Sequence, residues 1–390
     1  MRKSTIITHL TLLDENREIR GDISRFRDNT SPVLQTPHLE RKEITLEYNP
    51  FFHDSHYGTK AFEGIRAMWD QKRRQLHIIN LEEHITRLFN SAKALYMIKP
   101  EQQAESKIPT EITAVLKEYD SQNDIFFTKN EQYVKEMIIH NLLVNIDAGL
   151  INPESGEIYI RPLLRRTSHK DDKLGVHSTT HHITLEIMAQ QWPAYLSDPV
   201  LAVYPEKISN PLRKHKSGAN YGYGGIAKNW AMVGLAAQIG KKFDDALLQD
   251  MDGNITEATG ANFFAWEENN LTTAPEGEYL MGTKRANTIE LAKGLGITVV
   301  LNKYATQNAI EQLQSAFLTG TATGIEPIKA VYDPVSNLFK VYTTNEATKL
   351  LQTEYRNMVS GEAVNENNKA LQQRIVFNNT INLTAIPRYR

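Results

Sequence analysis

Cysteine is absent from this chain of 390 residues. Its absence excludes disulfide bonds, thiolate catalysis and metal sites built on cysteine. The chain does contain twelve histidines, which are scattered along it. His177, His181 and His182 lie near one another but have no matched acidic set, so the sequence predicts no metal site.

Long apolar runs and a strong net charge are also missing. No segment approaches the roughly 20 apolar residues that a membrane-spanning helix requires. Near the amino terminus, Thr8, His9 and Thr11 interrupt the apolar run that a signal peptide needs. A formal net charge of −2 provides no general attraction for nucleic acid. We therefore expect a cytoplasmic protein that acts on small molecules, without membrane or nucleic-acid partners.

The composition is that of a globular protein, with 41% hydrophobic and 23% charged residues. A chain of this length is too long for one ordinary core, and strand-like and helix-like segments alternate along it without a fixed repeat. We therefore expect an α/β (α+β) protein of two domains. The predicted division is a small amino-terminal domain over residues 1–190, an interdomain loop over 191–210 and a large domain over 211–390.

Hydrophobic periodicity predicts the elements of the first domain. A helix should begin after Asn80 as the cap, with Glu83 completing a capping box, and its apolar stripe is Leu81, Ile85, Leu88, Ala92 and Leu95. A second helix is expected from Tyr133 to about Gly149. Strands are expected over 43–48, 76–79, 157–161 and 183–188, and the third of them should stop at Pro162.

In the second domain, apolar residues over 227–239 are spaced as on a helix that Gly240 should end. Residues 246–272 should form an antiparallel meander with tight turns at 252–253 and 269–270. A further helix is expected over 286–295 and a short buried strand over 316–318. Such a meander places Lys216 and Glu257 on different elements, from which they could face one pocket.

Lys216 and Glu257 are the residues that point to chemistry. Lys216 opens the motif Lys-Ser-Gly-Ala-Asn-Tyr, and Glu257 lies within Asn-Ile-Thr-Glu-Ala-Thr-Gly-Ala-Asn-Phe-Phe. A lysine that can form an imine and a carboxylate that can keep a pyridinium nitrogen protonated are the groups that a pyridoxal 5'-phosphate (PLP) enzyme most needs from its protein. Taken alone, each would by default be a solvated surface charge, so the interpretation depends on the motifs around them.

Eight separated motifs follow one another along the chain, at residues 56–66, 84–88, 159–163, 175–176, 192–195, 216–221, 254–264 and 319–322. In this order they resemble the branched-chain amino acid aminotransferases, which belong to the fold-type IV (class IV) enzymes that use PLP. The resemblance implies two α/β domains, the larger with a pseudo-barrel sheet, and PLP between them. It also implies a homodimer or higher homo-oligomer in which a loop from one subunit completes the other's pocket.

The resemblance also implies roles for residues around the cofactor. Lys216 is similar to the lysine that holds PLP as a Schiff base and then shuttles a proton, and Glu257 to the acid that pairs with the ring nitrogen. Tyr221 is similar to the tyrosine that hydrogen-bonds the phenolate oxygen of the ring. The residues that match the phosphate contacts are Arg87, Thr283, Lys284 and Thr321, and the family usually has threonine where this chain has Lys284.

For the substrate, the family builds one pocket that accepts both an aliphatic side chain and the distal carboxylate of glutamate. The residues that match its aromatic walls are Tyr57, Phe62, Trp192 and Tyr195, with Val176 reaching in from a partner subunit. Tyr159 and Arg161 match the polar side, and because they are two apart on a strand they should point the same way. The amides of Thr321 and Ala322 match the site of the α-carboxylate.

The function that the resemblance implies is transfer of the amino group of L-leucine, L-isoleucine or L-valine to 2-oxoglutarate, by alternating turnover at one site. One alternative is a D-amino acid aminotransferase or an aminodeoxychorismate lyase of the same fold. A more remote alternative is a B6-binding protein without catalysis. Gly222, Gly224 and Gly225 depart from the family, which has larger residues after Tyr221 and hence a firmer helix start.

Overall fold

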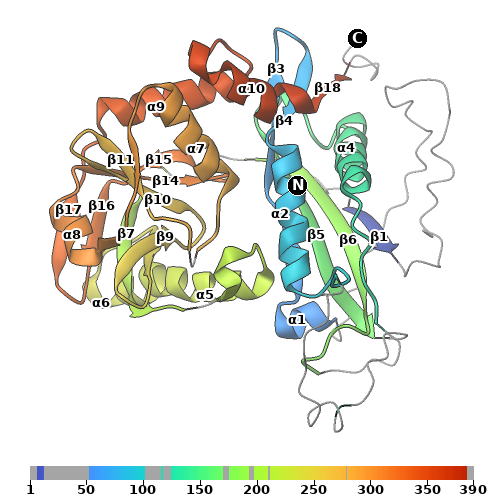
Figure 1. The fold of residues 1–390 in the computed structure, drawn as a ribbon, viewed down its shortest axis with the longest axis horizontal. Coiled ribbons are helices and arrows are strands. Elements are labelled where there is room, and N and C mark those ends of the chain that lie inside the picture. The colour runs from blue at the N-terminus through green and yellow to red at the C-terminus, as the bar shows by residue number, and fades with distance from the viewer. Residues whose placement is uncertain are drawn as a thin grey trace.

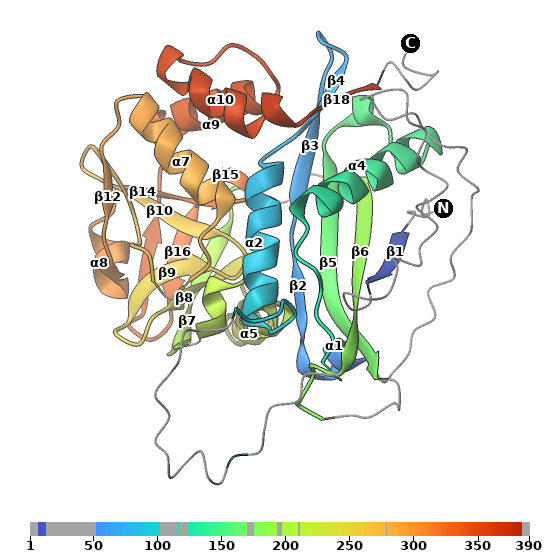
Figure 2. The same ribbon diagram turned by 45° about the vertical axis from the view of Figure 1, so that its right-hand side comes forward.

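A computed structural model describes residues 7–12, 52–101, 116, 124–169, 175–192, 197–209, 211–277 and 279–383. The described chain forms two β-sheets, each with its own helices (Figure 1). Helix α2 (Leu81–Ala94) lies between them, which is also visible after rotation in Figure 2. The mixture of helices and sheets agrees with the predicted fold class. The strand predicted over 43–48 lies outside the described residues.

The first sheet is antiparallel throughout and has the strand order β1-β6-β5-β3-β4-β18, with β2 paired to β5. Buried and less buried residues alternate along β6, as expected where one face of a sheet covers a core. Its strands are β1 (Ile7–Leu12), β2 (Lys60–Phe62), β3 (Ile65–Asp70), β4 (Gln75–Ile78), β5 (Ile158–His169), β6 (His181–Gln191) and β18 (Thr380–Asn382).

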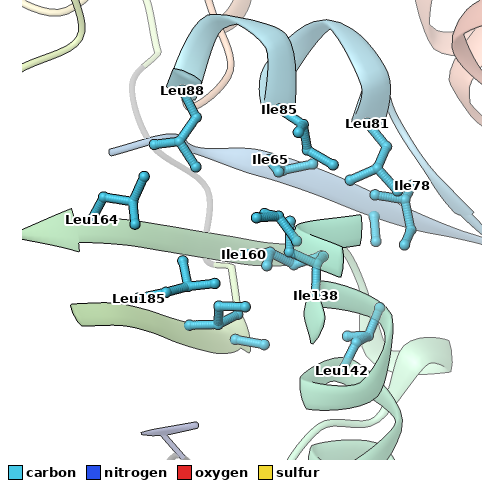
Figure 3. Packing of buried hydrophobic residues seen from close by; sticks show 14 of the residues in the cluster. Ile65, Ile78, Leu81, Ile85, Leu88, Ile138, Leu142, Ile160, Leu164 and Leu185 are labelled. Carbon is cyan, nitrogen blue, oxygen red and sulfur yellow. The ribbon is translucent and has the colours of Figure 1, made fainter. Parts of the chain in front are cut away.

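Helices α2 and α4 (Glu131–Asp147) cover this sheet. The predicted stripe of α2 is confirmed, because Leu81, Ile85, Leu88 and Ala92 are buried and Leu95 packs against the same cluster. Figure 3 shows how α2 and α4 meet β3, β4, β5 and β6 through Ile65, Ile78, Leu81, Ile85, Leu88, Ile138, Leu142, Ile160, Leu164 and Leu185. A short helix α1 (His53–Tyr57) and a 3₁₀ turn (Pro153–Ser155) complete this half.

The second sheet has the order β12-β11-β10-β9-β8-β7-β16-β17, with β13 paired to β9 and β14 to β10 and β15. Its strands are β7 (Val200–Lys207), β8 (Asp245–Gln249), β9 (Asn254–Ala258), β10 (Asn262–Glu267), β11 (Asn270–Thr273), β12 (Val299–Leu301), β13 (Tyr304–Ala305), β14 (Ser315–Gly320), β15 (Gly324–Pro327), β16 (Ala330–Asp333) and β17 (Leu338–Val341). The predicted meander is confirmed, since β8 to β11 pair consecutively and antiparallel.

The helices of this second half lie around its sheet (Figure 1). They are α5 (Gly218–Asn229), α6 (Ala236–Ile239), α7 (Thr283–Gly294), α8 (Thr306–Glu311), α9 (Glu346–Val359) and α10 (Lys369–Ile375), with 3₁₀ helices at η3 (Pro211–Lys214), Glu366–Asn368 and Phe377–Asn379. A π-helical segment (Trp230–Leu235) joins α5 to α6, which ends at Gly240 with φ of 67° as predicted. Within the described ranges, no helix has the length and apolar character needed to cross a membrane.

The start of α2 differs from the prediction. Asn80 has φ of 56°, and its side chain accepts no capping hydrogen bond. Its main-chain carbonyl oxygen accepts the first helical bond, from His84 N at 3.0 Å, and Glu83 forms an ion pair with Arg374 at 3.4 Å. Asparagine tolerates the left-handed conformation, so Asn80 turns the chain from β4 into α2 instead of acting as a side-chain cap.

Strand β5 does not stop at Pro162 but continues to His169, so that prediction is wrong. The carbonyl oxygen of Pro162 accepts a hydrogen bond from Glu63 N at 3.0 Å. In a strand the N–H and C=O of one residue point to the same side, so the missing donor of Pro162 faces the interruption between β2 and β3. The proline therefore removes no ladder bond there.

The chain passes between the two sheets more than once. Residues 191–210 were expected to form a loop, but they contain β7, which pairs in parallel with β8 and β16 of the second sheet. After α10, the chain returns to the first sheet, where β18 pairs antiparallel with β4. The first sheet is thus completed by residues from the far end of the chain.

Arg166 is fully buried in the first half of the molecule, so its replacement tests how much its hydrogen bonds stabilise the first sheet. Its guanidinium donates hydrogen bonds to four main-chain carbonyls, those of Ile125, Thr179, His181 and Tyr96. Arg166→Met should lower the free energy of unfolding by roughly 2–4 kcal/mol, since it leaves buried acceptors without a donor. Urea unfolding followed by circular dichroism measures this change.

The matched control is Lys72→Met in the same half of the molecule. Lys72 pairs with Glu362 at 2.6 Å, but both side chains are exposed. This variant should lose less than about 1 kcal/mol. Equal losses in the two variants would contradict the structural role of Arg166.

Candidate active site

Lys216 is held by its main chain against the first sheet. Its N–H donates to Ser91 Oγ of α2 at 2.9 Å, and its carbonyl oxygen accepts from Phe62 N of β2 at 3.1 Å. Ala61 of β2 and Ser217 form an adjacent isolated bridge. The Lys216 side chain then extends so that its Nζ donates to the hydroxyl of Tyr221 at 2.7 Å. Lys216 is therefore fixed both at its main chain and at its side-chain amine.

Helix α5 begins directly after Lys216 because Ser217 caps it, accepting a hydrogen bond from Asn220 N at 3.4 Å. The three glycines after Tyr221 do not prevent the helix. Gly224 is buried, and a Cβ there would lie 3.1 Å from the carbonyl oxygen of Thr259, so glycine allows α5 to approach the segment after Glu257.

Glu257 lies on β9, opposite Asn262 of β10. It is 8% exposed, and this burial raises its pKa to about 7 against the opposing effect of Arg213. Arg213 Nη2 lies 3.1 Å from Glu257 Oε1. Asn262 is in turn paired with Thr319 of β14. The pairing of β9, β10 and β14 therefore places the turn after β14 on the same side of the sheet region as Glu257.

The structure places all seven predicted cofactor residues around one cavity. These residues are Arg87, Lys216, Tyr221, Glu257, Thr283, Lys284 and Thr321. They come from α2, the segment before α5, α5 itself, β9, α7 and the turn after β14. The expectation that Lys216 and Glu257 face one pocket from different elements is confirmed.

Arg87 is anchored by a carboxylate to which sequence reasoning assigned no role. Its Nε and Nη2 donate to Glu63 at 2.6 and 2.7 Å, and its Nη1 donates to the carbonyl oxygen of Met281 at 3.1 Å. His84 Nδ1 also contacts Glu63, at 2.8 Å. Burial alone would raise the pKa of Glu63, but the Arg87 charge and these hydrogen bonds hold it well below its usual range. Two of the five N–H donors of Arg87 remain for a ligand.

Lys284 is a buried cation at the start of α7. It is 7% exposed, and no hydrogen bond or ion pair links its ammonium to another described residue. Its Nζ lies 3.1 Å from the centre of the Tyr355 ring. Burial, with the nearby charge of Arg66, lowers the pKa of Lys284 well below its ordinary value. The cap residue Gly282 offers no side chain, so no side-chain cap occupies the first amides of α7.

Four predicted substrate residues form a continuous wall beside Tyr221. The ring of Phe62 lies 5.0 Å from that of Tyr221, and the Arg161 guanidinium lies 4.7 Å from the centre of the Phe62 ring. Arg161 Nε donates to the hydroxyl of Tyr159 at 3.1 Å, which confirms that the two side chains share a face. Tyr159 in turn stacks on Trp192 at 4.4 Å between ring centres.

Gly64 is required by this wall. A Cβ at position 64 would lie 2.3 Å from the Tyr159 hydroxyl oxygen and would displace the ring. The neighbouring Arg66 is opposite Tyr159 in the sheet register. Phe62, Gly64 and Arg66 are two residues apart, and alternation along an extended chain places such positions on one face. This face is the one that contacts Tyr159 and Tyr221.

Arg66 is a second residue that sequence reasoning did not assign. Its Nη1 donates to the carbonyl oxygens of Thr321 at 2.9 Å and Ala322 at 3.3 Å, and it forms an ion pair with Glu157. These bonds fix the turn after β14 through its carbonyl oxygens. The position of Arg66 two residues after Gly64, within the first of the eight motifs, was the only signal for it.

Tyr57 and Val176 do not join the other predicted walls. They are 37% and 80% exposed, and, like the four wall residues, they are not among the residues that line the cavity around Lys216. His53 holds them near each other, because its Nε2 lies 2.8 Å from the carbonyl oxygen of Gly175 and its ring lies 4.5 Å from that of Tyr57. Tyr195 lies outside the described residues. Among the residues that are described, no cluster of three or more potential metal ligands occurs.

Comparison with known proteins agrees with this geometry. Residues 60–331 match the family model for amino-transferase class IV, which is well over half of the chain. The chain therefore belongs to the class IV aminotransferases.

Individual relatives are more distant. A probable branched-chain-amino-acid aminotransferase of Aquifex aeolicus is 26% identical over 87% of this chain and 93% of its own length. The branched-chain-amino-acid aminotransferase of Pseudomonas aeruginosa is 25% identical over 88% of this chain and 92% of its own. The structure of the T.th. branched-chain amino acid aminotransferase complexed with N-(5'-phosphopyridoxyl)-L-glutamate is similar with a TM-score of 0.60 and 26% identity, over 82% of this chain and 90% of that one.

The buried Glu63 predicts a pH dependence of stability. Its folded pKa lies below the ordinary value of 4.5, so its contribution is present above that value and is lost as pH falls below it. Glu63→Gln should lower the free energy of unfolding at neutral pH by roughly 3–5 kcal/mol, because Arg87 stays buried without its counter-charge. The variant should also lose less stability than the parent on acidification. Urea unfolding at several pH values measures both effects.

Glu101→Gln is the control, since Glu101 pairs with Lys93 at 2.9 Å on the surface and is 87% exposed. Its unfolding curve should follow that of the parent at every pH. If the free energy of unfolding of Glu63→Gln fell with acid as steeply as that of the parent, Glu63 would not be the group responsible for the pH dependence.

Proposed function

We propose that this aminotransferase uses PLP to move the amino group of L-leucine, L-isoleucine or L-valine to 2-oxoglutarate. The observation that carries the proposal is the placement of the Lys216 amine and the buried Glu257 carboxylate around one cavity. The names of its relatives support the same activity.

The donor set fits PLP. Lys216 offers an amine for the aldehyde, Tyr221 a hydroxyl for the ring oxygen and Glu257 a carboxylate for the ring nitrogen. Arg87, Thr283 and the first amides of α7 fit a phosphate, because a helix amino terminus favours anions. When bound, the cofactor supplies an electron-withdrawing ring that stabilises negative charge at the substrate α-carbon. Lys216 is the group that carries the proton to and from that carbon.

The wall of Phe62, Tyr159, Arg161 and Trp192 supports dual recognition of substrates. An aliphatic side chain is accepted against the rings of Phe62 and Trp192. The Arg161 guanidinium and the Tyr159 hydroxyl donate hydrogen bonds to the distal carboxylate of glutamate at the same place, since a charged donor pairs well with a carboxylate. The α-carboxylate is held by the amides of the turn at Thr321, whose carbonyls already point toward Arg66.

The exposed positions of Tyr57 and Val176 support a role across a subunit boundary. Both are predicted pocket residues, yet they are exposed on their own chain. In a homodimer, Val176 would reach into the partner's pocket, as the resemblance implies. We propose the same role for Tyr57, because His53 contacts both Tyr57 and the segment of Val176.

A panel of amino donors with 2-oxoglutarate tests the proposed reaction. Leucine, isoleucine and valine should be the best donors, and Lys216→Ala should reduce the rate by about 10²–10⁴-fold because the proton carrier is lost. D-alanine as the best donor would favour the D-amino acid aminotransferase, and pyruvate formed from aminodeoxychorismate would favour the lyase. A parent protein that binds PLP without any turnover would instead indicate a non-catalytic B6-binding protein.

Lys284 predicts a pH-dependent affinity for phosphate-bearing ligands. An anion binds its protonated form, so affinity should fall as pH rises through the lowered pKa of the free site. Lys284→Met should weaken binding of pyridoxamine 5'-phosphate by roughly 10–100-fold in the neutral range and should flatten this pH dependence. This ligand lacks the aldehyde and therefore isolates the non-covalent part of binding, which quenching of protein fluorescence can measure.

Lys293→Met provides the control, because Lys293 is exposed near the opposite end of the same helix. It should leave the affinity and its pH dependence unchanged. An equally steep pH dependence in Lys284→Met and in the parent would assign the effect to another group.

A further inference from the structure

Arg213 lies directly behind Glu257 and does not line the cavity. It belongs to η3, three residues before Lys216, and its side chain is 2% exposed. Its Nη2 donates to Glu257 Oε1 at 3.1 Å and to Thr256 Oγ1 at 2.8 Å. The Thr256 hydroxyl in turn donates to the carbonyl oxygen of Leu248 at 3.1 Å. Since its only hydrogen is used there, the lone pairs of Thr256 Oγ1 remain to accept from Arg213.

The groups that face Glu257 come from several elements. Arg213 approaches from η3, Lys216 from the segment before α5 and Tyr279 from the connection between β11 and α7. The main-chain N–H of Leu280 also donates a hydrogen bond. Of these groups, Arg213 is the one in ion-pair contact with the carboxylate.

Burial and Arg213 act on Glu257 in opposite directions. Burial is the larger effect, so the pKa of Glu257 is raised to about 7 even though the charge and hydrogen bond of Arg213, the strongest opposing influences, lower it. A carboxyl at this depth without a facing cation would be protonated at neutral pH. A protonated acid is no partner for a positively charged ring nitrogen.

We propose that Arg213 is a positioning residue that keeps Glu257 ionised, so that the one proton between Glu257 and the cofactor's ring nitrogen resides on the nitrogen. The inference rests on the proposed function, because it takes PLP as the group that Glu257 faces. No proton is gained or lost in the exchange. Without Arg213, the N–H bond breaks, an O–H bond forms on Glu257 and the nitrogen becomes a neutral acceptor.

The local fold ties this effect to the catalytic amine. The segment from η3 to α5 is tightly turned, with His215 N donating to the carbonyl oxygen of Leu212 at 2.9 Å and Ser217 N to that of His215 at 3.0 Å. Arg213 and Lys216 therefore have fixed relative positions. One short segment supplies both the cation that sets the charge of Glu257 and the amine that carries the proton.

Nitrogen-15 NMR of holoenzyme loaded with ring-¹⁵N PLP tests the proposal, because protonation strongly changes the chemical shift of a pyridine nitrogen. The parent, Arg213→Lys and the exposed neighbouring control Lys214→Met should all show the protonated signal at neutral pH. Arg213→Met and Glu257→Gln should both show the neutral signal. Arg213→Gln keeps a hydrogen-bond donor without the charge, so it should behave like Arg213→Met and replaces it if that protein does not fold.

Steady-state kinetics of the same variants provide a second test, through kcat and KM. Arg213→Met should lower kcat by roughly tenfold or more with a smaller effect on KM, because Arg213 touches no substrate surface. Arg213→Lys should recover most of the loss. A purely structural role would not move the nitrogen signal or separate the two parameters.

A protonated nitrogen signal in Arg213→Met or Arg213→Gln would overturn the inference, whether or not Glu257→Gln loses that signal. A protonated signal in Glu257→Gln would also overturn it, since Glu257 would then not be the partner of the nitrogen. Failure of the proposed function is distinguishable, because a parent that binds no PLP would show no ring-nitrogen signal from the bound cofactor.

Discussion

The geometry of the site depends on two main-chain hydrogen bonds at Lys216. The residue follows β7 of the second sheet in sequence, yet its N–H bonds to α2 and its carbonyl oxygen to β2, both in the first half of the molecule. Glu257, by contrast, is fixed within the second sheet by the pairing of β9 with β8 and β10. The amine and the carboxylate are therefore brought together by the contact between the sheets, and the cavity exists only because that contact is made.

Charge is distributed unevenly around this cavity. Arg87 has Glu63 as its counter-charge and Glu257 has Arg213, so each of these buried ions is already compensated. Lys284 has no such partner among the described side chains, and its burial is unfavourable while the site holds no anion. A dianionic phosphate supplies what this end of the cavity lacks, which is why the departure from the usual threonine is chemically consistent with the same cofactor.

The sequence predicted the parts of the fold that follow local rules. Periodicity located α2 and the meander, and the ordered motifs located all seven residues around the cavity. Pairing partners from distant segments could not be read in this way. The strand through Pro162 depends on an interruption in a neighbouring strand, and Arg213 and Glu63 gain their importance only from the carboxylate and guanidinium that the tertiary fold places against them.

The return of the chain to the first sheet through β18 has a mechanical consequence. Two connections, one before β7 and one after α10, join the same pair of layers. Any hinge rotation of one layer away from the other must bend both connections and also break the bonds at Lys216. Wide opening between the two layers is therefore disfavoured in this architecture.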